Sequence, residues 1–281
     1  MTRIAVVTDS SAYLPEELVR EYGIRVVPLN VHFNGAVYKD LVDITEDEFF
    51  RKLAAAPELP STSQPSAGEF AEVFRAAAQG ADGVFAVVIS SALSGTYSSA
   101  MAAKEMLPDI PIAVVDSRSV SMGLGFQALA AARAAREGRS LEEIVSLVEA
   151  LVPRTRVYFL LDTLKYLAKG GRIGGAEALL GSVLAIKPLL QIENGRVEPL
   201  DKVRTRNKAI GRLMEHFKKE CDGHAVHCAV LNAQVPDEAE ELRKEVARAF
   251  PAVKDLVIAR VSPVIATHTG PGALGLCFYT E

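Results

Sequence analysis

Hydroxyl side chains gather between residues 90 and 100, directly after an apolar run that ends at Ile89. Within this stretch Ser94 and Thr96 flank Gly95, and a helix-forming run rich in Ala follows. A helix that starts after a buried strand directs unpaired backbone N–H groups at the sheet edge, where hydroxyls add uncharged donors. The pattern predicts a site for an oxyanion, either a carboxylate or a phosphate, although each hydroxyl taken alone is also explained as a helix cap.

A second hydroxyl-rich segment covers residues 60–65, where two prolines enclose Thr62 and Ser63. The fixed φ angle of proline stiffens such a loop and keeps the neighbouring helices from extending into it. A rigid loop can aim both hydroxyls at a target. Its composition also suits an ordinary surface connection.

Two further side chains lie next to glycine-rich turns. His268 precedes the stiff turn Gly270-Pro271-Gly272 in a segment without a neighbouring charge, and it is either functional or a structural histidine. Arg172 follows two glycines at an expected helix end. It either balances the helix dipole or offers its guanidinium group to an anion.

Arg204 and Arg206 flank the start of another expected helix, where positive charge is locally unfavourable. This placement hints at an external anion or a partner surface.

Several familiar catalytic motifs are absent from the sequence. It contains no GxxxxGK[ST], HExxH, GxSxG or DxDxDG pattern, so it offers no nucleotide cradle, zinc site, nucleophile elbow or calcium loop of those kinds. The run that begins at Gly123 resembles a dinucleotide fingerprint but starts too far beyond the preceding strand. His224 and His227 point to opposite faces of an expected strand. We therefore expect no catalytic residue, no metal and no cofactor.

The composition narrows the possible partners. The chain has 281 residues, 49% of them hydrophobic, and a formal net charge of −4. Lys and Arg are scattered, which argues against nucleic acid as a partner. Three cysteines without a CxxC pair, at positions 221, 228 and 277, favour a reducing cytoplasm over a disulfide framework. No apolar stretch is long enough for a membrane span, so we expect at most transient membrane contact.

The elements that must position these residues predict an α/β protein of two domains. Residues 1–155 alternate between β-rich and helix-forming segments, which is typical of a parallel sheet covered by helices, an α/β/α domain. Asn34-Gly35 predicts a hairpin, and capping boxes at Thr45 and Ser66 predict helices that begin near residues 46 and 67. This domain carries the Thr62 and Ser94 loops.

Residues 156–281 predict a second, mixed-sheet α/β domain, because hairpin-linked strands alternate with helices there. It carries Arg172 and His268. Asp162 is expected to cap a short helix at 163–169. Residues 176–190 are rich in Ala, Leu and Gly, which suits either core packing or a slot for a chain-like ligand.

Taken together, the short motifs resemble the DegV family over essentially the whole chain. They are Thr8-Asp9-Ser10-Ser11, Thr62-Ser63-Gln64-Pro65-Ser66, Ser94-Gly95-Thr96-Tyr97, Leu164-Lys165-Tyr166-Leu167 with Lys169-Gly170-Gly171-Arg172-Ile173, Arg204-Thr205-Arg206, and His268-Thr269-Gly270-Pro271-Gly272-Ala273-Leu274-Gly275. Each is short alone, but their order and spacing are jointly specific. The resemblance implies a parallel α/β/α domain and a mixed-sheet α/β domain, with a long-chain fatty acid held between or within them.

The resemblance also implies roles for individual residues. Thr62 and Ser94 fall on the positions that bind the acyl carboxylate in that family. Arg172 and His268 fall in or near the same polar network, to which we also assign Ser63, Gly95 and Thr96. Similar members of the family are acyl-carrying subunits of bacterial fatty acid kinase, which hand the acid to a separate ATP-dependent subunit that makes acyl phosphate for phospholipid synthesis.

The physical interpretation agrees with this resemblance. A fatty acid such as palmitate, stearate or oleate needs an apolar channel, and its burial contributes ~0.8 kcal/mol per methylene. The alternative is a hydrolase or transferase that acts on a small anionic metabolite, with His268 as general base and Ser94 as nucleophile or oxyanion donor. A lipid-responsive binding protein without a kinase partner is a third hypothesis.

Overall fold

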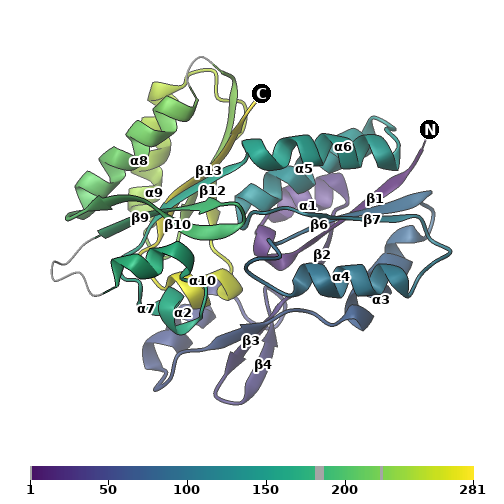
Figure 1. The fold of residues 1–281 in the computed structure, drawn as a ribbon, viewed down its shortest axis with the longest axis horizontal. Helices are drawn as coiled ribbons and strands as arrows, with labels where there is room; N and C mark the ends of the chain where they lie inside the picture. The colour runs from purple at the N-terminus through teal and green to yellow at the C-terminus, as the bar shows by residue number, and fades with distance from the viewer. Residues whose placement is uncertain (1, 181–186, 222–223) are drawn as a thin grey trace.

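The computed structural model describes residues 2–180, 187–221 and 224–281. Within these residues the strands form a four-stranded parallel sheet, a six-stranded mixed sheet and a small three-stranded antiparallel sheet. Figure 1 shows the parallel sheet with its helices on the right, the mixed sheet on the left and the small sheet below them. The predicted α/β class, with one parallel and one mixed sheet, is confirmed.

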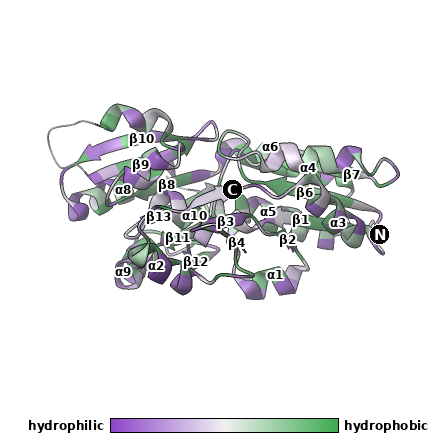
Figure 2. Ribbon diagram, turned by 90° about the horizontal axis from the view of Figure 1, so that it is seen from below, coloured by the Kyte–Doolittle hydropathy of each residue, from purple (hydrophilic) through white to green (hydrophobic). Residues whose placement is uncertain are grey.

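The parallel sheet is buried between helices on both faces. Its strand order is β2-β1-β6-β7. Alternate side chains of β6 point to opposite faces: Phe85 and Val87 pack with α5 and α6, whereas Val84 and Val88 pack with α3 and α4. Figure 2 shows the hydrophobic character of β6. The elements are β1 (Ile4–Asp9), β2 (Arg25–Val27), β6 (Gly83–Val88), β7 (Ile112–Asp116), the 3₁₀ helix η1 (Ser10–Ala12), α1 (Glu16–Tyr22), α3 (Ala67–Ala78), α4 (Thr96–Glu105), α5 (Met122–Arg136) and α6 (Leu141–Leu151).

The small sheet has the order β4-β3-β5 and consists of β3 (Asn30–Phe33), β4 (Ala36–Lys39) and β5 (Ser61–Ser63). The hairpin predicted at Asn34-Gly35 is confirmed, and both residues have positive φ angles. The expectation of a loop throughout residues 60–65 is wrong for 61–63, because this segment pairs antiparallel with β3. Ladder hydrogen bonds therefore hold Thr62 in place together with the flanking prolines.

The predicted capping boxes are confirmed. Thr45 caps α2 (Glu46–Ala55) and Ser66 caps α3, each with a glutamate at the third helical position that bonds back to the cap. These two helices bracket β5 in the sequence. The caps therefore fix where the chain enters and leaves the segment that carries Thr62.

The mixed sheet has the order β10-β9-β8-β13-β11-β12, and among the strands that the structure describes there only β11 and β12 pair in parallel. One face packs against α8 and α9 through a core that includes Phe217 and Phe278. The elements are β8 (Arg156–Leu160), β9 (Lys187–Glu193), β10 (Arg196–Val203), β11 (Val226–Asn232), β12 (Leu256–Arg260), β13 (Leu274–Thr280), α7 (Lys165–Lys169), α8 (Arg206–Glu220), α9 (Pro236–Ala249), α10 (Pro263–Thr269) and the 3₁₀ helices η2 (Val152–Arg154) and η3 (Gly174–Leu179). Helices α7 and α10 contact each other.

Two local expectations for this part of the chain need comment. The prediction that Asp162 caps a helix is wrong: α7 begins at Lys165, and the Asp162 carboxylate instead pairs with Lys187 and Arg206. Of the apolar segment 176–190, residues 176–179 belong to η3 and 187–190 to β9, while residues 181–186 lie outside the described part of the chain.

Specific polar contacts join the two large sheets. Ser90, after β6, donates a hydrogen bond of 2.8 Å to the carbonyl of Gly195 in the β9–β10 turn. Arg133 of α5 pairs with Asp255, which precedes β12, at 3.1 Å. Arg260 of β12 pairs with the buried Glu46 of α2 at 2.6 Å.

Among the described residues, no helix is both long and apolar enough to cross a bilayer.

Replacing Gly195 with Ala is expected to lower the melting temperature. The left-handed φ of +79° at Gly195 costs a non-glycine residue about 1 kcal/mol or more. An added Cβ would also overlap the Ser90 hydroxyl that bonds to this turn. Thermal unfolding followed by circular dichroism measures the loss.

The control is Gly211→Ala in α8, where a Cβ meets no atom within 4 Å. This substitution is expected to leave the melting temperature unchanged or raise it, because alanine favours a helix over glycine by roughly 0.5–1 kcal/mol. The double variant S90A/G195A should recover part of the loss. A Gly195→Ala protein that melts like wild type would contradict the assigned contact.

Candidate functional site

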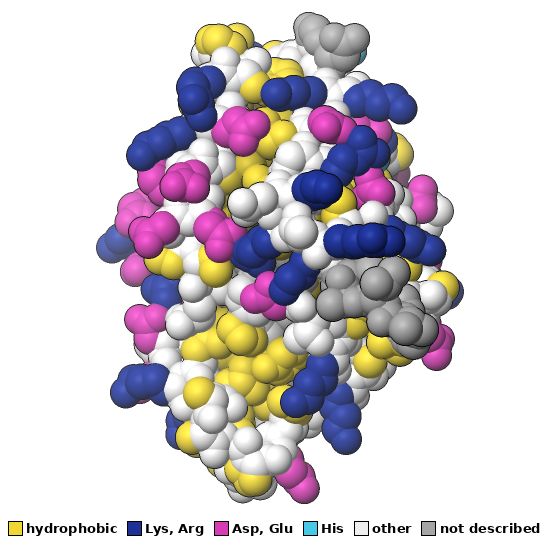
Figure 3. Space-filling view, turned by 90° about the vertical axis from the view of Figure 1, so that its left-hand side faces the viewer, with side chains coloured by type: hydrophobic (Ala, Val, Ile, Leu, Met, Phe, Trp, Pro, Cys, Tyr) yellow, Lys and Arg dark blue, Asp and Glu magenta, His cyan; other side chains and the backbone are white. Residues whose placement is uncertain are grey.

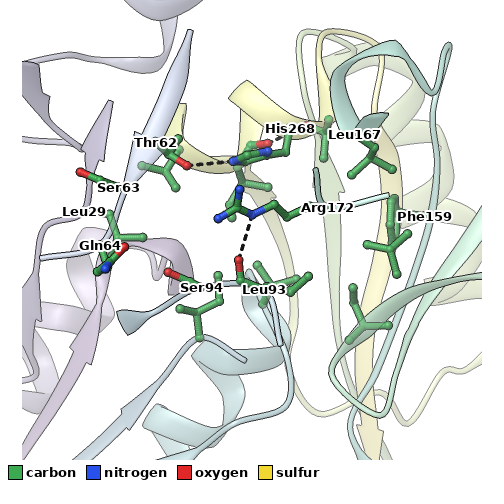
Figure 4. A pocket seen from close by; sticks show the side chains of 17 residues that line it. Leu29, Thr62, Ser63, Gln64, Leu93, Ser94, Phe159, Leu167, Arg172 and His268 are labelled. Atoms are coloured by element: carbon green, nitrogen blue, oxygen red, sulfur yellow. Dashed lines mark hydrogen bonds between the residues drawn. The ribbon is translucent and has the colours of Figure 1, made fainter. Parts of the chain in front are cut away.

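A cavity with one polar end lies where the small sheet, the end of β6 and helices α7 and α10 meet (Figure 4). It contains about 660 Å³ of space, its open mouth included. Its polar lining comprises Thr62, Ser63, Gln64, Ser94, Arg172, His268 and Thr269. Its apolar lining comprises Leu29, Ile89, Leu93, Val120, Phe159, Leu167, Ile192, Val197, Val264 and Ile265. The fold thus places Thr62, Ser94, Arg172 and His268 around one space, which Ser63 borders although its hydroxyl is bonded elsewhere.

A hydrogen bond of 2.9 Å joins Thr62 Oγ1 to His268 Nε2. The two residues are 206 positions apart and come from β5 and α10 (Figure 4). His268 precedes the Gly-Pro-Gly turn, as the sequence shows, and lies in the last turn of α10. Helix α10 begins at Pro263, where the fixed φ suits the first helical position, and Ser262 caps it.

The surroundings of the His268 ring determine which nitrogen carries the proton. Nδ1 is buried against Gly170, where a Cβ would overlap it, and has no hydrogen-bond partner among the described residues. An N–H group at Nδ1 would be an unpaired buried donor, which is costly. We therefore assign the proton to Nε2, which donates to Thr62 Oγ1. The Thr62 hydroxyl proton is then available to a ligand in the cavity.

Burial, together with the nearby positive charge of Arg172, lowers the pKa of His268 to about 4. The sequence shows no charge beside His268, and the fold brings Arg172 close from a distant segment. His268 is consequently neutral at physiological pH. It acts as a hydrogen-bond donor and adds no positive charge to the cavity.

The Ser94 loop leads into helix α4, as predicted, and presents a hydroxyl at its start. Ser94 Oγ lies 2.8 Å from Thr96 Oγ1 and accepts a weaker bond from the Thr96 N–H at 3.3 Å. Thr96 is fully buried and supports Ser94 without lining the cavity. With Thr96 as donor, the Ser94 hydroxyl can donate to a ligand.

Gly95 makes room for a contact between the two hydroxyl segments. A Cβ on Gly95 would lie 2.9 Å from Gln64 Nε2, so a larger residue would push the amide away. The exposed Gln64 side chain therefore packs beside the Ser94 loop. This residue was missed as a site residue, although it belongs to the Thr-Ser-Gln-Pro motif, because sequence spacing does not show that the two segments touch.

Arg172 ties the Ser94 loop to the second half of the chain. Its Nε donates to the Leu93 carbonyl at 3.0 Å (Figure 4). One terminal nitrogen donates to the Gly170 carbonyl at 2.8 Å. Arg172 thus links α7, which ends just before it, to the loop after β6. Its guanidinium group brings positive charge to the polar end of the cavity.

The Ser63 hydroxyl is engaged on the other face of β5. It lies 2.9 Å from His32 Nε2 and accepts a bond from the Asn30 side chain at 3.3 Å. Successive residues of a strand point to opposite faces, so Ser63 cannot share the orientation of Thr62. Its contacts secure β5 against β3.

Arg206 does not need an external anion. It is a salt-bridge partner of Glu238 at 2.7 Å and of Asp162 at 3.2 Å, and both carboxylates belong to this chain. An external anion or partner surface near Arg204 and Arg206 therefore stays a prediction that these contacts do not require. The helix start is compensated by internal ion pairs that the sequence did not reveal.

A second, apolar cavity continues from the first. It contains about 390 Å³ of space, its open mouth included, and shares Val120, Phe159, Ile265 and Thr269 with the polar-ended cavity. Its other lining residues include Val157, Leu231, Val261 and Leu274. The two cavities therefore adjoin at shared walls, with polar groups lining the first and apolar walls around the second. No group of three or more His, Cys, Asp or Glu in the described ranges is placed to hold a metal ion.

Comparison with known proteins identifies the family of this chain. The family model described as "Uncharacterised protein, DegV family" matches residues 3–281. The chain belongs to the DegV family. A DegV domain-containing protein of Streptomyces coelicolor is 43% identical over 274 residues, which cover 97% of each chain.

Solved structures of the family share this fold. A DegV family protein from Thermus thermophilus, described by its fatty acid binding, matches with a TM-score of 0.95 at 39% identity, over 100% of both chains. A stearic acid-binding protein from Eubacterium ventriosum matches with a TM-score of 0.90 at 31% identity, over 100% of this chain and 98% of the other. These likenesses establish the two-domain arrangement for this family member.

We expect the imidazole of His268 to remain uncharged until the pH falls to about 4. The unfolded chain takes up a proton at this residue near pH 6.5, so the pKa in the folded state is lower than in the unfolded state. The neutral form therefore contributes stability that is lost as the pH falls from 6.5 to 4, by about 3 kcal/mol for this group. Nuclear magnetic resonance titration of the ring measures the pKa directly.

Urea unfolding of wild type and His268→Gln between pH 7 and 4.5 provides the second measurement. The glutamine variant should lack this component of the pH dependence, while the remaining titrating groups act equally in both proteins. A ring that titrates near pH 6.5 would rule out the buried neutral state.

Proposed function

We propose that this protein binds a long-chain fatty acid, with the carboxylate at Thr62 and Ser94 and the acyl chain in the apolar part of the cavity. One observation carries the proposal: hydroxyl groups gather in a cavity whose other walls are apolar, and a second, apolar cavity adjoins it. The related proteins from Thermus thermophilus and Eubacterium ventriosum, which bind fatty acids, support it.

The two ends of the cavity suit the two parts of such a ligand. Each methylene buried among apolar side chains contributes ~0.8 kcal/mol, so the chain supplies most of the affinity. The hydroxyls of Thr62 and Ser94 each donate to the carboxylate, and hydrogen bonds to a charged group are stronger than neutral ones. His268 orients the Thr62 hydroxyl, and Thr96 orients that of Ser94.

Arg172 contributes long-range attraction to the carboxylate, while its hydrogen bonds to backbone carbonyls hold it in place. Because the direct donors are neutral, the carboxylate is held without a buried Lys. Hydrogen bonds from neutral donors leave one carboxylate oxygen able to react with a second substrate.

We further propose that the bound acid is presented to a separate ATP-dependent kinase subunit. In that reaction a carboxylate oxygen attacks the γ-phosphorus of ATP, acyl phosphate forms and ADP leaves. Figure 3 shows Lys and Arg side chains interspersed with Asp and Glu on the face at the left of Figure 1, above a hydrophobic area. Such a face suits contact with a partner or transient contact with a membrane.

The three cysteines are buried and free, which is consistent with a cytoplasmic protein.

The alternative of a hydrolase or transferase with His268 as general base is less well supported by the geometry. A base with a pKa of about 4 is weak at neutral pH. Its Nε2 is also bonded to Thr62, whereas Ser94, the candidate nucleophile, is bonded to Thr96. Turnover of a small anionic metabolite by the isolated chain, lost in His268→Ala, would establish the alternative.

Fatty acid binding is tested by native mass spectrometry of protein prepared without lipid and then mixed with palmitate, stearate or oleate. We expect a one-to-one complex with wild type. Thr62→Val and Ser94→Ala should each weaken binding roughly tenfold or more, since each removes a hydrogen bond to a charged group, worth about 1.5–3 kcal/mol. Ser61→Ala and Ser98→Ala, at exposed positions, serve as controls and should bind like wild type. Failure of wild type to take up any of the three acids would refute the proposal.

The kinase step has its own experiment. Oleate-loaded protein, ATP and a bacterial fatty acid kinase subunit are combined, and acyl phosphate is trapped with hydroxylamine. We expect product only when all three components are present. If the protein binds oleate but no acyl phosphate forms, the kinase proposal is refuted and the proposal of fatty acid binding stands.

A further inference from the structure

We propose that Asp40 is a positioning residue of the fatty acid site: its carboxylate fixes the start of helix α10 and thereby places His268, at the end of that helix, against Thr62. The proposal deepens the proposed function. Its structural part, the placement of His268, is measurable without any fatty acid.

Asp40 connects three segments that are distant in sequence. Its Oδ1 accepts a hydrogen bond from the Val264 N–H in the first turn of α10 at 3.2 Å, across 224 positions. Its Oδ2 accepts from the Ser10 hydroxyl at 2.7 Å, just after β1. The Asp40 N–H donates to the Leu29 carbonyl at 2.8 Å, directly before β3. The side chain is fully buried and lies outside the cavity that binds the ligand in our proposal.

Through these contacts one carboxylate fixes the positions of both segments that supply the Thr62–His268 bond. Helix α10 spans seven residues, so a shift at Val264 carries His268 with it. On the other side, Leu29 leads into β3, whose Val31 pairs with Thr62 in β5. Asp40 therefore holds α10 at a fixed position relative to the sheet that carries Thr62.

The charge of Asp40 is linked to the position of α10. Burial raises the pKa of Asp40 to about 7, whereas hydrogen bonds from Ser10, Val264 and Ser262 lower it. Two of these donors belong to the start of α10. The hydrogen bonds from Val264 and Ser262 favour the ionised carboxylate. By linkage, ionisation of Asp40 strengthens these same hydrogen bonds, so the charged form holds α10 more firmly.

The other ionisable groups around Asp40 do not replace it. Asp9, at the end of β1, raises the pKa of Asp40 slightly, and its own carboxylate bonds to Ser11 and to the N–H of Ile89. Tyr13 has a pKa raised to about 12 and stays neutral. Glu46 is compensated by Arg260. None of these side chains bonds to α10 in the described residues.

Replacement of Asp40 by Asn is expected to preserve or raise the stability of the fold while it loosens the position of helix α10. The pKa of Asp40 is raised above the value of 3.8 in the unfolded chain, so this group lowers stability progressively as the pH rises from about 4 to about 7, and the full cost is present at pH 8. Asp40→Asn removes that cost and should melt at or above the temperature of wild type at pH 8. A purely structural residue would instead lower the melting temperature when replaced.

The structural test compares wild type, Asp40→Asn and the exposed control Asp109→Asn without ligand. At pH 8 we expect faster hydrogen exchange in the peptide that covers residues 262–270 of Asp40→Asn, and a changed ring signal of His268 in nuclear magnetic resonance. Asp109→Asn should match wild type in both. Ser10→Ala, which releases Oδ2 without changing charge, should show a smaller change in the same direction. Unchanged exchange and an unchanged His268 signal in both Asp40→Asn and Ser10→Ala would overturn the proposal.

Oleate binding by isothermal titration calorimetry gives the functional measurement. At pH 8 we expect Asp40→Asn to bind about tenfold more weakly than wild type, in line with loss of a charged hydrogen bond. At pH 6 the difference should shrink to about twofold or less, because wild-type Asp40 is then mostly protonated. Equal oleate affinities of wild type and Asp40→Asn at both pH values would overturn the inference about Asp40 and leave fatty acid binding intact. A wild-type protein that binds no oleate would instead refute the proposed function. The hydrogen exchange data would then decide the role of Asp40.

Discussion

The hydrogen bond between Thr62 and His268 forms only when the small sheet and helix α10 are held together, since its partners lie 206 positions apart. It is partly buried, which limits the exchange of this partner for water. The same burial keeps the ring neutral and assigns its proton to the nitrogen that faces Thr62. The direction of the Thr62 hydroxyl, and hence the donor offered to the cavity, follows from this constraint.

The other elements of the site extend the same arrangement. The end of β6 and the start of α4 bring Ser94 to the carboxyl edge of the parallel sheet, where ligands bind in open α/β folds. Arg172 fastens that loop to α7, and the shape of Gly95 lets Gln64 pack beside it. Beyond these polar groups the walls are apolar. Such a division lets chain burial supply affinity, while a few fixed donors select the headgroup.

Several buried polar groups lower the stability of the fold at some pH. Burial raises the pKa of Asp40 and of Glu46 to about 7 and lowers that of His268, because the fold disfavours the charged form of each of these groups. All three lie at or behind junctions between α2, α10 and the sheets. Their placement is consistent with a fold that gives up some stability to hold a site in one geometry.

The sequence by itself determined the local features: the capping boxes at Thr45 and Ser66, the hairpin at Asn34-Gly35, the helix after Ser94 and the succession of parallel and mixed strands. These depend on residues close together in the chain, whose propensities and hydrogen bonds act within a few positions. Only the tertiary structure decided that residues 61–63 form a strand, that His268 ends a helix beside Arg172, that Arg206 is paired internally and that Asp40 reaches α10. Each of these outcomes depends on a contact between distant segments, and such contacts are set by the packing of sheets and helices, which local spacing does not encode.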